Sequence, residues 1–255
     1  MANISTDSLG HTQAHKITNS VTTKKVLILA AGRGTRMGEY SKDLPKPLLP
    51  LHSKPILSHI LDRFARHFEF VIAVGYKSQM IKNYIAKAHS DLQIEFADVD
   101  RFEGPQSGPG YSALCGRSFL NEPFYLVCSD TLWNEPLPQG QNWIGTFDVP
   151  RLESRNYCNL TLEGDKVTAI EFDAYRENQK TFMGVAHIQD SEIFFSGIES
   201  SLARYRELNR HNEIKFRAGF DALIRNSELR HHEVRSWLDL GRLELYEKAQ
   251  ALDLG

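Results

Sequence analysis

The chain has 255 residues, and its 30 basic and 32 acidic side chains give a formal net charge of −2. This balance excludes the strongly basic surface that nucleic acids and anionic membranes attract, and no apolar run is long enough to span a bilayer. The length suits one large domain or two small ones, with a substantial hydrophobic core.

The polar start of the chain and its few cysteines indicate a cytoplasmic protein. Residues 1–24 lack the apolar stretch of a secretory signal peptide, and we expect a flexible tail there. Cys115, Cys128 and Cys158 share no metal-binding spacing. An odd, sparse set of cysteines is typical of a reducing compartment rather than of a disulfide scaffold. We therefore expect one folded domain over residues 25–255 in the cytoplasm, with homo-oligomer formation left open.

Strands and helices alternate in the first half of the chain. Continuous apolar runs predict buried strands over 26–30, 70–76, 92–98 and 124–130. The helical spacing of apolar residues predicts helices over 55–68, 78–88 and 110–120. This alternation indicates βαβ units and a mostly parallel, Rossmann-like sheet that is flanked by helices.

The pattern changes in the second half of the chain. Strand-like stretches with turn signals between them occupy 142–149, 157–172 and 181–188. They indicate a smaller, partly antiparallel segment that is attached to the first sheet. Three further helices, over 191–208, 218–228 and 242–252, and a short strand within 233–241 complete an expected α/β fold.

The loop after the first strand combines glycines with cationic side chains. Ligands of an open parallel sheet bind where its strands end at their carboxyl edge. Gly32 and Gly34 let the backbone approach a ligand and can point N–H groups at anionic oxygens. Arg36 supplies a planar fork that suits phosphate, and Lys46 is held between two prolines. The spacing matches neither G-x-G-x-x-G nor the P-loop.

Two stretches, LAAGRGTRM at 29–37 and PKPLLP at 45–50, resemble the signature of sugar-1-phosphate nucleotidyltransferases, the pyrophosphorylase family. The resemblance implies a GT-A-like fold with a nucleotide-binding part over 25–135 and an acceptor-binding part over 140–255. It also implies that Arg36 and Lys46 are catalytic. The implied nucleotide contacts in this region are Leu29, Ala30, Ala31, Gly32 and Gly34.

The stretch QSGPGYS at 106–112 resembles the family segment that lines the nucleobase. By this resemblance Gln106 faces the base, while Gly108 and Gly110 leave room for it. The alternative is a loop with two glycines that opens a helix. An amide can pair with the edges of several bases, so CTP, UTP, GTP and dTTP all stay open.

Two aspartates resemble the metal ligands of the family. LVCSD at 126–130 matches a strand that ends in one of them, here Asp130, and WLDLG at 237–241 supplies the other, Asp239. The alternatives are a turn or helix cap for Asp130 and the N-cap of the last helix for Asp239. A hard cation such as Mg²⁺, held by the two carboxylates, would offset the repulsion between two phosphate-bearing reactants.

The resemblance implies a Mg-dependent transferase of the EC 2.7.7 type. It would move a nucleoside monophosphate from a nucleoside triphosphate to a small phosphorylated acceptor and release pyrophosphate. Arg36 would stabilise charge on the triphosphate and the leaving pyrophosphate, and Lys46 would neutralise the α-phosphate. No nucleic acid and no membrane is expected as a partner.

The acceptor side departs from the family pattern. The resemblance assigns the acceptor wall to Tyr157, Cys158, Glu171, Phe182 and Gly184. Cys158 stands where sugar enzymes usually carry glycine, and Phe182 stands where N-acetylhexosamine enzymes carry asparagine. The lysine that contacts the acceptor phosphate is missing at its matching place, and Lys166 and Lys180 are both candidates to replace it.

Three functions therefore stay open. The first, which we expect, is a nucleotidyltransferase for a sugar 1-phosphate. The second is a cytidylyltransferase for a non-sugar phosphate such as phosphocholine. The third is a catalytically silent, pyrophosphorylase-like regulatory protein, against which the presence of all four expected catalytic and metal-binding side chains argues.

Overall fold

The computed structural model describes residues 23–149, 151–172, 180–208 and 210–252, so the expected tail lies outside the described residues except for its last two. The strands are β1 (Lys25–Ala30), β2 (Pro50–Leu51), β3 (Lys54–Pro55), β4 (Glu69–Val74), β5 (Gln93–Asp98), β6 (Phe124–Cys128), β7 (Thr131–Trp133), β8 (Trp143–Phe147), β9 (Cys158–Glu163), β10 (Lys166–Phe172), β11 (Lys180–Ile188), β12 (Arg230–Glu233) and β13 (Trp237–Asp239). The α-helices are α1 (Tyr40–Asp43), α2 (Ile56–Leu61), α3 (Ser78–Ala88), α4 (Pro109–Cys115), α5 (Arg151–Ser154), α6 (Ser191–Glu207), α7 (Arg217–Asn226) and α8 (Leu243–Gln250). Short 3₁₀ helices are η1 (Thr35–Met37), η2 (Lys46–Leu48) and η3 (Arg117–Phe119).

A nine-stranded sheet in the order β5-β4-β1-β6-β11-β8-β12-β10-β9 runs through the molecule. Strands β5, β4, β1 and β6 are parallel, and β11 pairs antiparallel with β6. Strand β9 pairs with both β10 and β11, so the antiparallel half turns back on itself. The parallel first half and the partly antiparallel second half confirm the expected α/β fold class.

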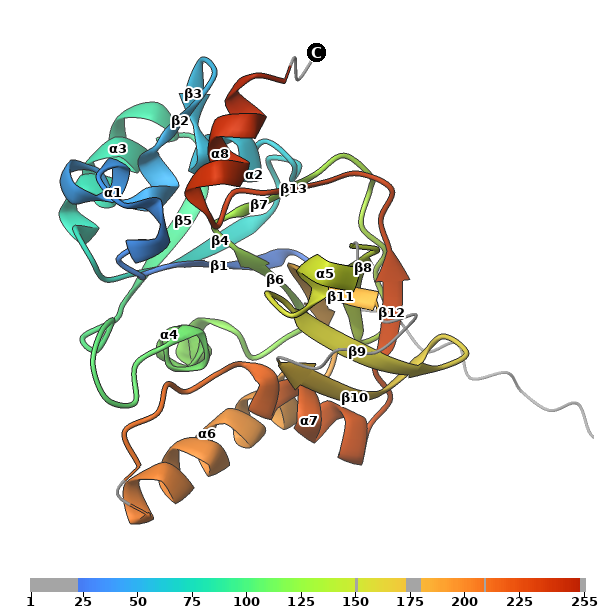
Figure 1. The fold of residues 1–255 in the computed structure, drawn as a ribbon. Coiled ribbons are helices and arrows are strands. Elements are labelled where there is room, and N and C mark those ends of the chain that lie inside the picture. The colour runs from blue at the N-terminus through green and yellow to red at the C-terminus, as the bar shows by residue number, and fades with distance from the viewer. Residues whose placement is uncertain (1–22, 150, 173–179, 209, 253–255) are drawn as a thin grey trace, which may run out of the picture.

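The hydrophobic core lies on both faces of the parallel strands. Val26, Ile28 and Ala30 of β1 belong to a cluster with residues of α2, α3 and α8. Leu27 and Leu29 alternate with them and join a second cluster with α4, α6 and α7. Figure 1 shows these two groups of helices on opposite sides of the sheet. The continuous apolar run of β1 follows from this burial on both faces.

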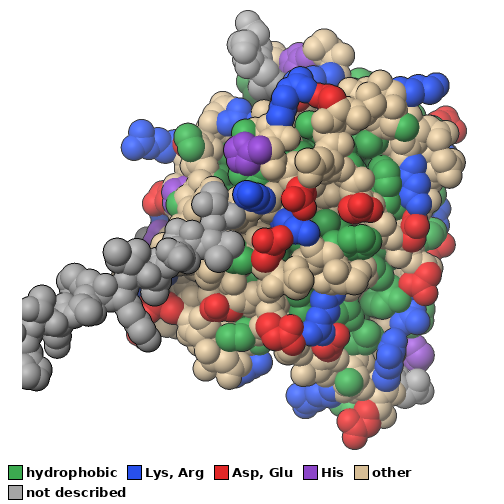
Figure 2. All heavy atoms as spheres, turned by 180° about the vertical axis from the view of Figure 1, so that it is seen from behind, with side chains coloured by type: hydrophobic (Ala, Val, Ile, Leu, Met, Phe, Trp, Pro, Cys, Tyr) green, Lys and Arg blue, Asp and Glu red, His purple; other side chains and the backbone are tan. Residues whose placement is uncertain are grey.

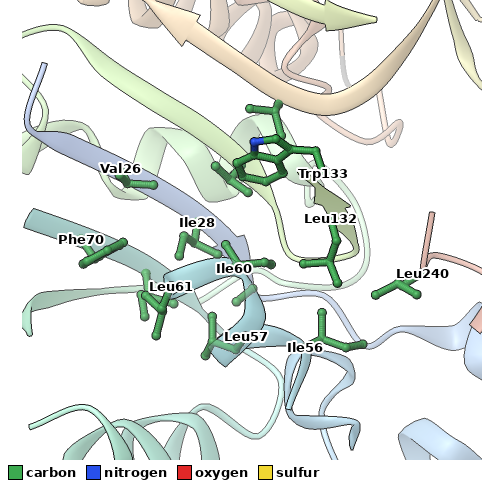
Figure 3. Packing of buried hydrophobic residues seen from close by; sticks show 14 of the residues in the cluster. Val26, Ile28, Ile56, Leu57, Ile60, Leu61, Phe70, Leu132, Trp133 and Leu240 are labelled. Carbon is green, nitrogen blue, oxygen red and sulfur yellow. The ribbon is translucent and has the colours of Figure 1, made fainter. Parts of the chain in front are cut away.

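The helix expected over 55–68 is much shorter in the structure. Helix α2 ends at Leu61, and successive turns follow, with the Phe64 N–H bonded to the Leu61 carbonyl. The Phe64 ring contacts the Phe68 ring edge-on at 5.3 Å and lies 6.0 Å from the Trp133 ring. Phe64 and Phe68 therefore have helical spacing in the sequence, but they pack as aromatic side chains in turns rather than in a longer helix. Figure 3 shows the neighbouring side chains of α2 against β1 and Trp133.

The segment 233–241 contains parts of two strands rather than one. Strand β12 runs parallel to β8 in the main sheet, whereas β13 pairs antiparallel with β7 in a separate two-stranded sheet. Strand β7 was not expected, because the sequence suggested that the apolar strand simply ends at Asp130. This small β7–β13 sheet lies at the carboxyl end of β6.

The surface carries both signs of charge. On the face shown in Figure 2, Lys and Arg side chains are interspersed with Asp and Glu side chains, as the small net charge suggests. In the part of the chain that the structure describes, no helix combines the length and the apolar character needed to cross a membrane.

One buried polar side chain connects β11 to Thr23, at the start of the described residues. His187 Nδ1 lies 2.6 Å from the Gln141 carbonyl oxygen, and Nε2 lies 2.6 Å from Thr23 Oγ1. A neutral imidazole satisfies both contacts when Nδ1–H donates to the carbonyl and Nε2 accepts from the hydroxyl. Burial lowers the pKa of His187 below its ordinary value, although the Gln141 carbonyl acts in the opposite direction.

This burial predicts acid sensitivity of the fold. The neutral His187 side chain stabilises the fold fully at pH values above its unfolded pKa of about 6.5. This contribution is lost as the pH falls from there through the folded pKa of His187. We expect the free energy of unfolding in urea to decrease between about pH 7 and pH 5, by up to about 1.4 kcal/mol per pH unit from this group. The decrease should be shallower in His187→Gln and unchanged in His211→Gln, which alters an exposed histidine. Equal slopes in all three proteins would contradict the assignment.

Candidate active site

The loop after β1 places Lys46 at the edge of the sheet. Gly34 has a left-handed backbone with φ of 67°, and a Cβ there would lie 3.0 Å from the Cβ of Lys46. A glycine is therefore needed for both conformation and close approach. Pro45 precedes the 3₁₀ helix η2, in which Lys46 is the first residue, and its ring fixes the entry of the chain.

Lys46 forms the shortest ion pair of the site with Asp130, which follows β6. Lys46 Nζ donates to Asp130 Oδ2 at 2.6 Å, and Arg36 Nη2 lies 3.9 Å from the same oxygen. Burial acts to raise the pKa of the Asp130 carboxyl, but the Lys46 and Arg36 charges outweigh it and hold that pKa below its usual value. Asp130 is thus an anion at neutral pH.

The β7–β13 sheet brings Asp239 beside Asp130. Asp239 pairs with Thr131 across the ladder, and the Leu240 N–H donates to the Asp130 carbonyl at 2.7 Å. A Cβ on Gly241 would lie 2.9 Å from Asp239 Oδ1 and 3.0 Å from Asp130 Oδ2. The two carboxylates therefore converge on one point. Asp239 belongs to β13, and the N-cap of the last helix is Arg242, which removes the capping alternative for Asp239.

The convergent carboxylates fit a hard divalent cation. Among the described residues, no group of three or more His, Cys, Asp or Glu side chains could hold a metal ion by itself. Mg²⁺ does not need such a group, because it is commonly held by one or two carboxylates together with water and substrate phosphates. The donor set of Asp130 and Asp239 therefore suits Mg²⁺ bound with a phosphate-bearing ligand.

Two cavities meet at these charged groups. The first, of about 590 Å³, extends from the loop after β1 to the start of α4, and the second, of about 490 Å³, lies between β13, β11 and the chain before β9. We call them the nucleotide cavity and the acceptor cavity. Both are lined by Arg36, Cys128, Asp130, Glu213 and Phe216.

Most of the expected nucleotide contacts line the nucleotide cavity, namely Leu29, Ala31, Gly32, Gly34 and Gly108. Three others lie outside its lining. The Ala30 side chain packs into the core on the opposite face of the sheet. The Gln106 side chain accepts from Arg101 and donates to the Arg210 carbonyl. Gly110 is buried against the backbone of Ile214. Residues that the sequence analysis missed in this lining include Ser107, Ser112 and Ser129.

The acceptor cavity contains four of the five expected acceptor residues, Tyr157, Cys158, Phe182 and Gly184. Glu171 lies on β10, outside the lining. Phe182 is only 6% exposed, because its ring packs on Phe216 and Phe220 at 5.4 and 5.7 Å between ring centres. Phe182 is therefore chiefly a core residue. Burial raises the pKa of the Cys158 thiol to about 12, so a thiolate nucleophile is not formed at neutral pH.

Neither candidate lysine for the acceptor phosphate lies in the acceptor cavity. Lys166 pairs with Glu228, and Lys180 pairs with Asp148 and Glu233. Two cations that the sequence analysis did not single out, Arg155 and Lys215, line the cavity instead.

Tyr157 makes a contact that the sequence analysis did not foresee. Its hydroxyl donates to Asp239 Oδ2 at 2.8 Å and accepts from Arg242 at 2.8 Å. Burial, reinforced by the Asp239 charge, raises the pKa of Tyr157, so the hydroxyl keeps its proton at neutral pH.

Comparison with known proteins supports the resemblance to nucleotidyltransferases. Residues 26–136 match the family model of the MobA-like NTP transferase domain. Over 222 residues the chain is 25% identical to the bifunctional protein GlmU of Methanococcus maripaludis, and the match covers 84% of this chain and 51% of that protein. By these matches the chain resembles nucleotidyltransferases. It spans about half the length of the curated GlmU relatives that it matches.

Other known proteins resemble this chain more locally or only in fold. A probable glucose-1-phosphate cytidylyltransferase of Bacillus subtilis is 45% identical over 62 residues, which are 24% of each chain. The crystal structure of a UDP-glucose pyrophosphorylase complexed with UDP-glucose superposes with a TM-score of 0.74 at 18% identity and covers 90% of this chain and 97% of that one. This likeness confirms the GT-A-like fold.

The convergence of the two carboxylates at Gly241 predicts a sensitive position. In Gly241→Ala the added methyl group would lie about 3 Å from both carboxylates, and it is 3.4 Å from the Arg36 guanidinium. Such close contacts would force the carboxylates to shift, and a shift of about 1 Å at reacting groups can cost about 10²-fold in rate. We expect a loss of nucleotidyl transfer with little change in melting temperature, because the nearest atoms are side-chain ends of the site. A folded variant with wild-type turnover would show that the two aspartates do not act together at this point.

Proposed function

We propose that the chain transfers a nucleoside monophosphate from a nucleoside triphosphate to a sugar 1-phosphate and releases pyrophosphate. The observation that carries this proposal is the position of the Lys46–Asp130 pair, with Arg36 beside it, at the junction of two cavities. A reaction between two phosphate-bearing molecules needs positive charge at their meeting point, and this junction provides it.

The chemistry follows from these charges. An oxygen of the acceptor phosphate attacks the α-phosphorus, the new O–P bond forms, and the bond to the bridging oxygen of pyrophosphate breaks with its electron pair. A phosphate monoester is already an anionic nucleophile, so no general base is required. Arg36, whose side chain is 63% exposed, can follow the charge onto the leaving pyrophosphate, whereas the largely buried Lys46 stays near the α-phosphate.

Asp130 and Asp239 would hold the divalent cation. When bound, Mg²⁺ supplies positive charge to the phosphate oxygens and aligns the reacting groups. The protein contributes two fixed carboxylates, and Lys46 and Arg36 limit their net negative charge before substrates arrive.

The names of relatives support a sugar phosphate as the acceptor, since they include a glucose-1-phosphate cytidylyltransferase and a UDP-glucose pyrophosphorylase. A second candidate is phosphocholine. The acceptor cavity is lined by the aromatic side chains of Tyr157, Phe216 and Trp237 and by the carboxylate of Glu213. Aromatic faces and an acidic group are the features that recognise a quaternary ammonium ion.

A substrate panel tests the proposed function. The protein would be incubated with CTP, UTP, GTP or dTTP against glucose 1-phosphate, N-acetylglucosamine 1-phosphate or phosphocholine, and pyrophosphate release would be followed with and without EDTA. We expect release with one triphosphate and a sugar 1-phosphate, abolished by EDTA. Turnover with phosphocholine alone would favour the second candidate, and no turnover with any pair would favour the silent regulatory protein.

The catalytic assignment has its own matched test. Arg36→Gln should lower kcat by roughly 10²-fold, the usual loss of one preorganised charge-stabilising donor. Its melting temperature should hardly change, because the side chain is mostly exposed. Arg66→Gln alters another exposed arginine that is paired with an aspartate, Asp91, and should retain wild-type kcat. Equal kcat in the two variants would remove Arg36 from the mechanism.

The cations that line the acceptor cavity, Arg155 and Lys215, give a prediction for binding of the acceptor phosphate. Lys215 lines the acceptor cavity, and its charge lowers the pKa of Cys158 in the same wall, against the larger effect of burial. Lys215→Gln should therefore raise KM for the acceptor by about tenfold, the value of one charged hydrogen bond, while KM for the triphosphate stays constant. Lys166→Gln is the control, since Lys166 pairs with Glu228 outside the cavity. A KM effect in the control and none at Lys215 would restore Lys166 as the acceptor-phosphate lysine.

A further inference from the structure

The Tyr157 hydroxyl lies between a cation and a carboxylate. Arg242 Nη2 and Asp239 Oδ2 are each 2.8 Å from the hydroxyl oxygen. Arginine has no acceptor atom, so it must donate to the tyrosine oxygen. The single tyrosine proton is then directed to Asp239, because an ionised carboxylate can only accept. The order of donors is therefore fixed from Arg242 through Tyr157 to Asp239.

This order of donors limits what Tyr157 can offer to the acceptor cavity. The hydroxyl has one proton, and that proton is engaged by Asp239. Tyr157 therefore cannot donate to an acceptor molecule while it holds Asp239, although its ring remains part of the cavity wall. The prediction that Tyr157 binds the acceptor therefore excludes donation from its hydroxyl, while the ring is available for contact.

Both oxygens of Asp239 are held by the protein. Oδ2 accepts from Tyr157, and Oδ1 accepts from the Gly241 N–H at 2.7 Å. Two donors on opposite oxygens stop rotation of the carboxylate about its last bond. An ionised carboxylate offers about four lone-pair sites, so acceptor capacity remains on the oxygens that converge with Asp130.

The ring of Tyr157 is itself fixed. The Arg242 guanidinium carbon lies 5.4 Å from the centre of the ring, and the Trp237 ring packs edge-on against it at 5.4 Å. Trp237 is in turn anchored by its indole N–H, which donates to Thr131 Oγ1 at 2.8 Å. Contacts with Arg242 and Trp237 therefore hold the ring in place, and the ring positions the hydroxyl at Asp239.

We propose that Tyr157 and Arg242 are positioning residues that orient Asp239 for a divalent cation. This inference rests on the proposed function, in which Asp130 and Asp239 hold the metal. Hydrogen-bond partners of metal-binding carboxylates and imidazoles typically change metal affinity by 10- to 100-fold when they are removed. Loss of the Tyr157 hydroxyl should therefore weaken metal binding more than it weakens binding of the acceptor.

The experiment measures metal binding directly. Mn²⁺ alone is titrated into the wild-type protein and into Tyr157→Phe, and the free ion is followed by its EPR signal. We expect about tenfold weaker Mn²⁺ binding in the variant. In turnover assays with the best substrate pair of the panel, the Mg²⁺ concentration for half-maximal rate should rise by a similar factor. The acceptor KM at saturating Mg²⁺ should change by less than about twofold, because the ring is retained.

The chain offers a closely matched control. Tyr111 also donates its hydroxyl to an aspartate, Asp100, at 2.7 Å, and the Arg101 guanidinium lies 5.1 Å from its ring centre. This group lies outside the linings of both cavities. Tyr111→Phe therefore makes the same chemical change elsewhere and should leave Mn²⁺ binding and turnover at the wild-type values.

Arg242 variants separate positioning from general loss of structure. Arg242→Lys retains a cationic donor and should bind Mn²⁺ more tightly than Arg242→Met, with wild type tightest. Unchanged Mn²⁺ affinity in Tyr157→Phe, or a raised acceptor KM without a metal effect, would overturn the inference while leaving the proposed function intact. A wild-type protein that neither binds Mn²⁺ nor releases pyrophosphate would overturn both.

Discussion

The antiparallel pairing of β7 with β13 assembles the site. It sets the Leu240 N–H on the Asp130 carbonyl and brings two aspartates that are distant in the sequence to one point. Backbone bonds of this kind contribute only about 0.5–1.5 kcal/mol each. Burial of a large apolar side chain contributes about 1.5–3 kcal/mol. Leu132 and Leu240 both belong to the core around α2, which Figure 3 shows, so apolar packing contributes more than these hydrogen bonds to holding the carboxylates together.

Opposite charges then set the electrostatic state of that point. Two carboxylates close together would repel and would tend to bind a proton, which would spoil a metal site. Lys46 prevents this at Asp130, where its ammonium group lies nearer than the Arg36 guanidinium, at 2.6 against 3.9 Å. The Lys46–Asp130 pair is largely buried, so removal of either partner would leave an unpaired buried charge and destabilise the fold. Lys46 therefore has a structural role as well as its proposed catalytic one.

The sequence predicted the parallel half of the fold well, and the reasons are physical. Strands such as β1 are buried on both faces and read as continuous apolar runs. The helix over 55–68 was overextended because Phe64 and Phe68 share helical spacing while packing in turns. The three-residue strands β7 and β13 carry too little pattern to recognise. The contact of Tyr157 with Asp239 joins distant segments, and nothing in either local sequence signals it.

The glycine segment at 106–112 has a packing role in addition to the base contact that its motif predicts. A Cβ on Gly110 would lie 2.7 Å from the Ile214 carbonyl oxygen, and a Cβ on Gly108 would lie 2.9 Å from the same oxygen. Real side chains do not approach so closely, so these glycines make room for protein backbone.

Two hydrogen bonds complete that contact. The Gly110 N–H donates to the Ile214 carbonyl at 2.8 Å, and the Ile214 N–H donates to the Ser107 carbonyl at 2.7 Å. The segment held in this way carries Glu213 and Phe216, which line both cavities, and Lys215, which lines the acceptor cavity. The segment around Ile214 therefore forms a wall that both cavities share. Its position is fixed by hydrogen bonds to the loop that borders the nucleotide cavity. The glycines thereby shape the acceptor cavity from a position that belongs, by sequence, to the nucleotide-binding part.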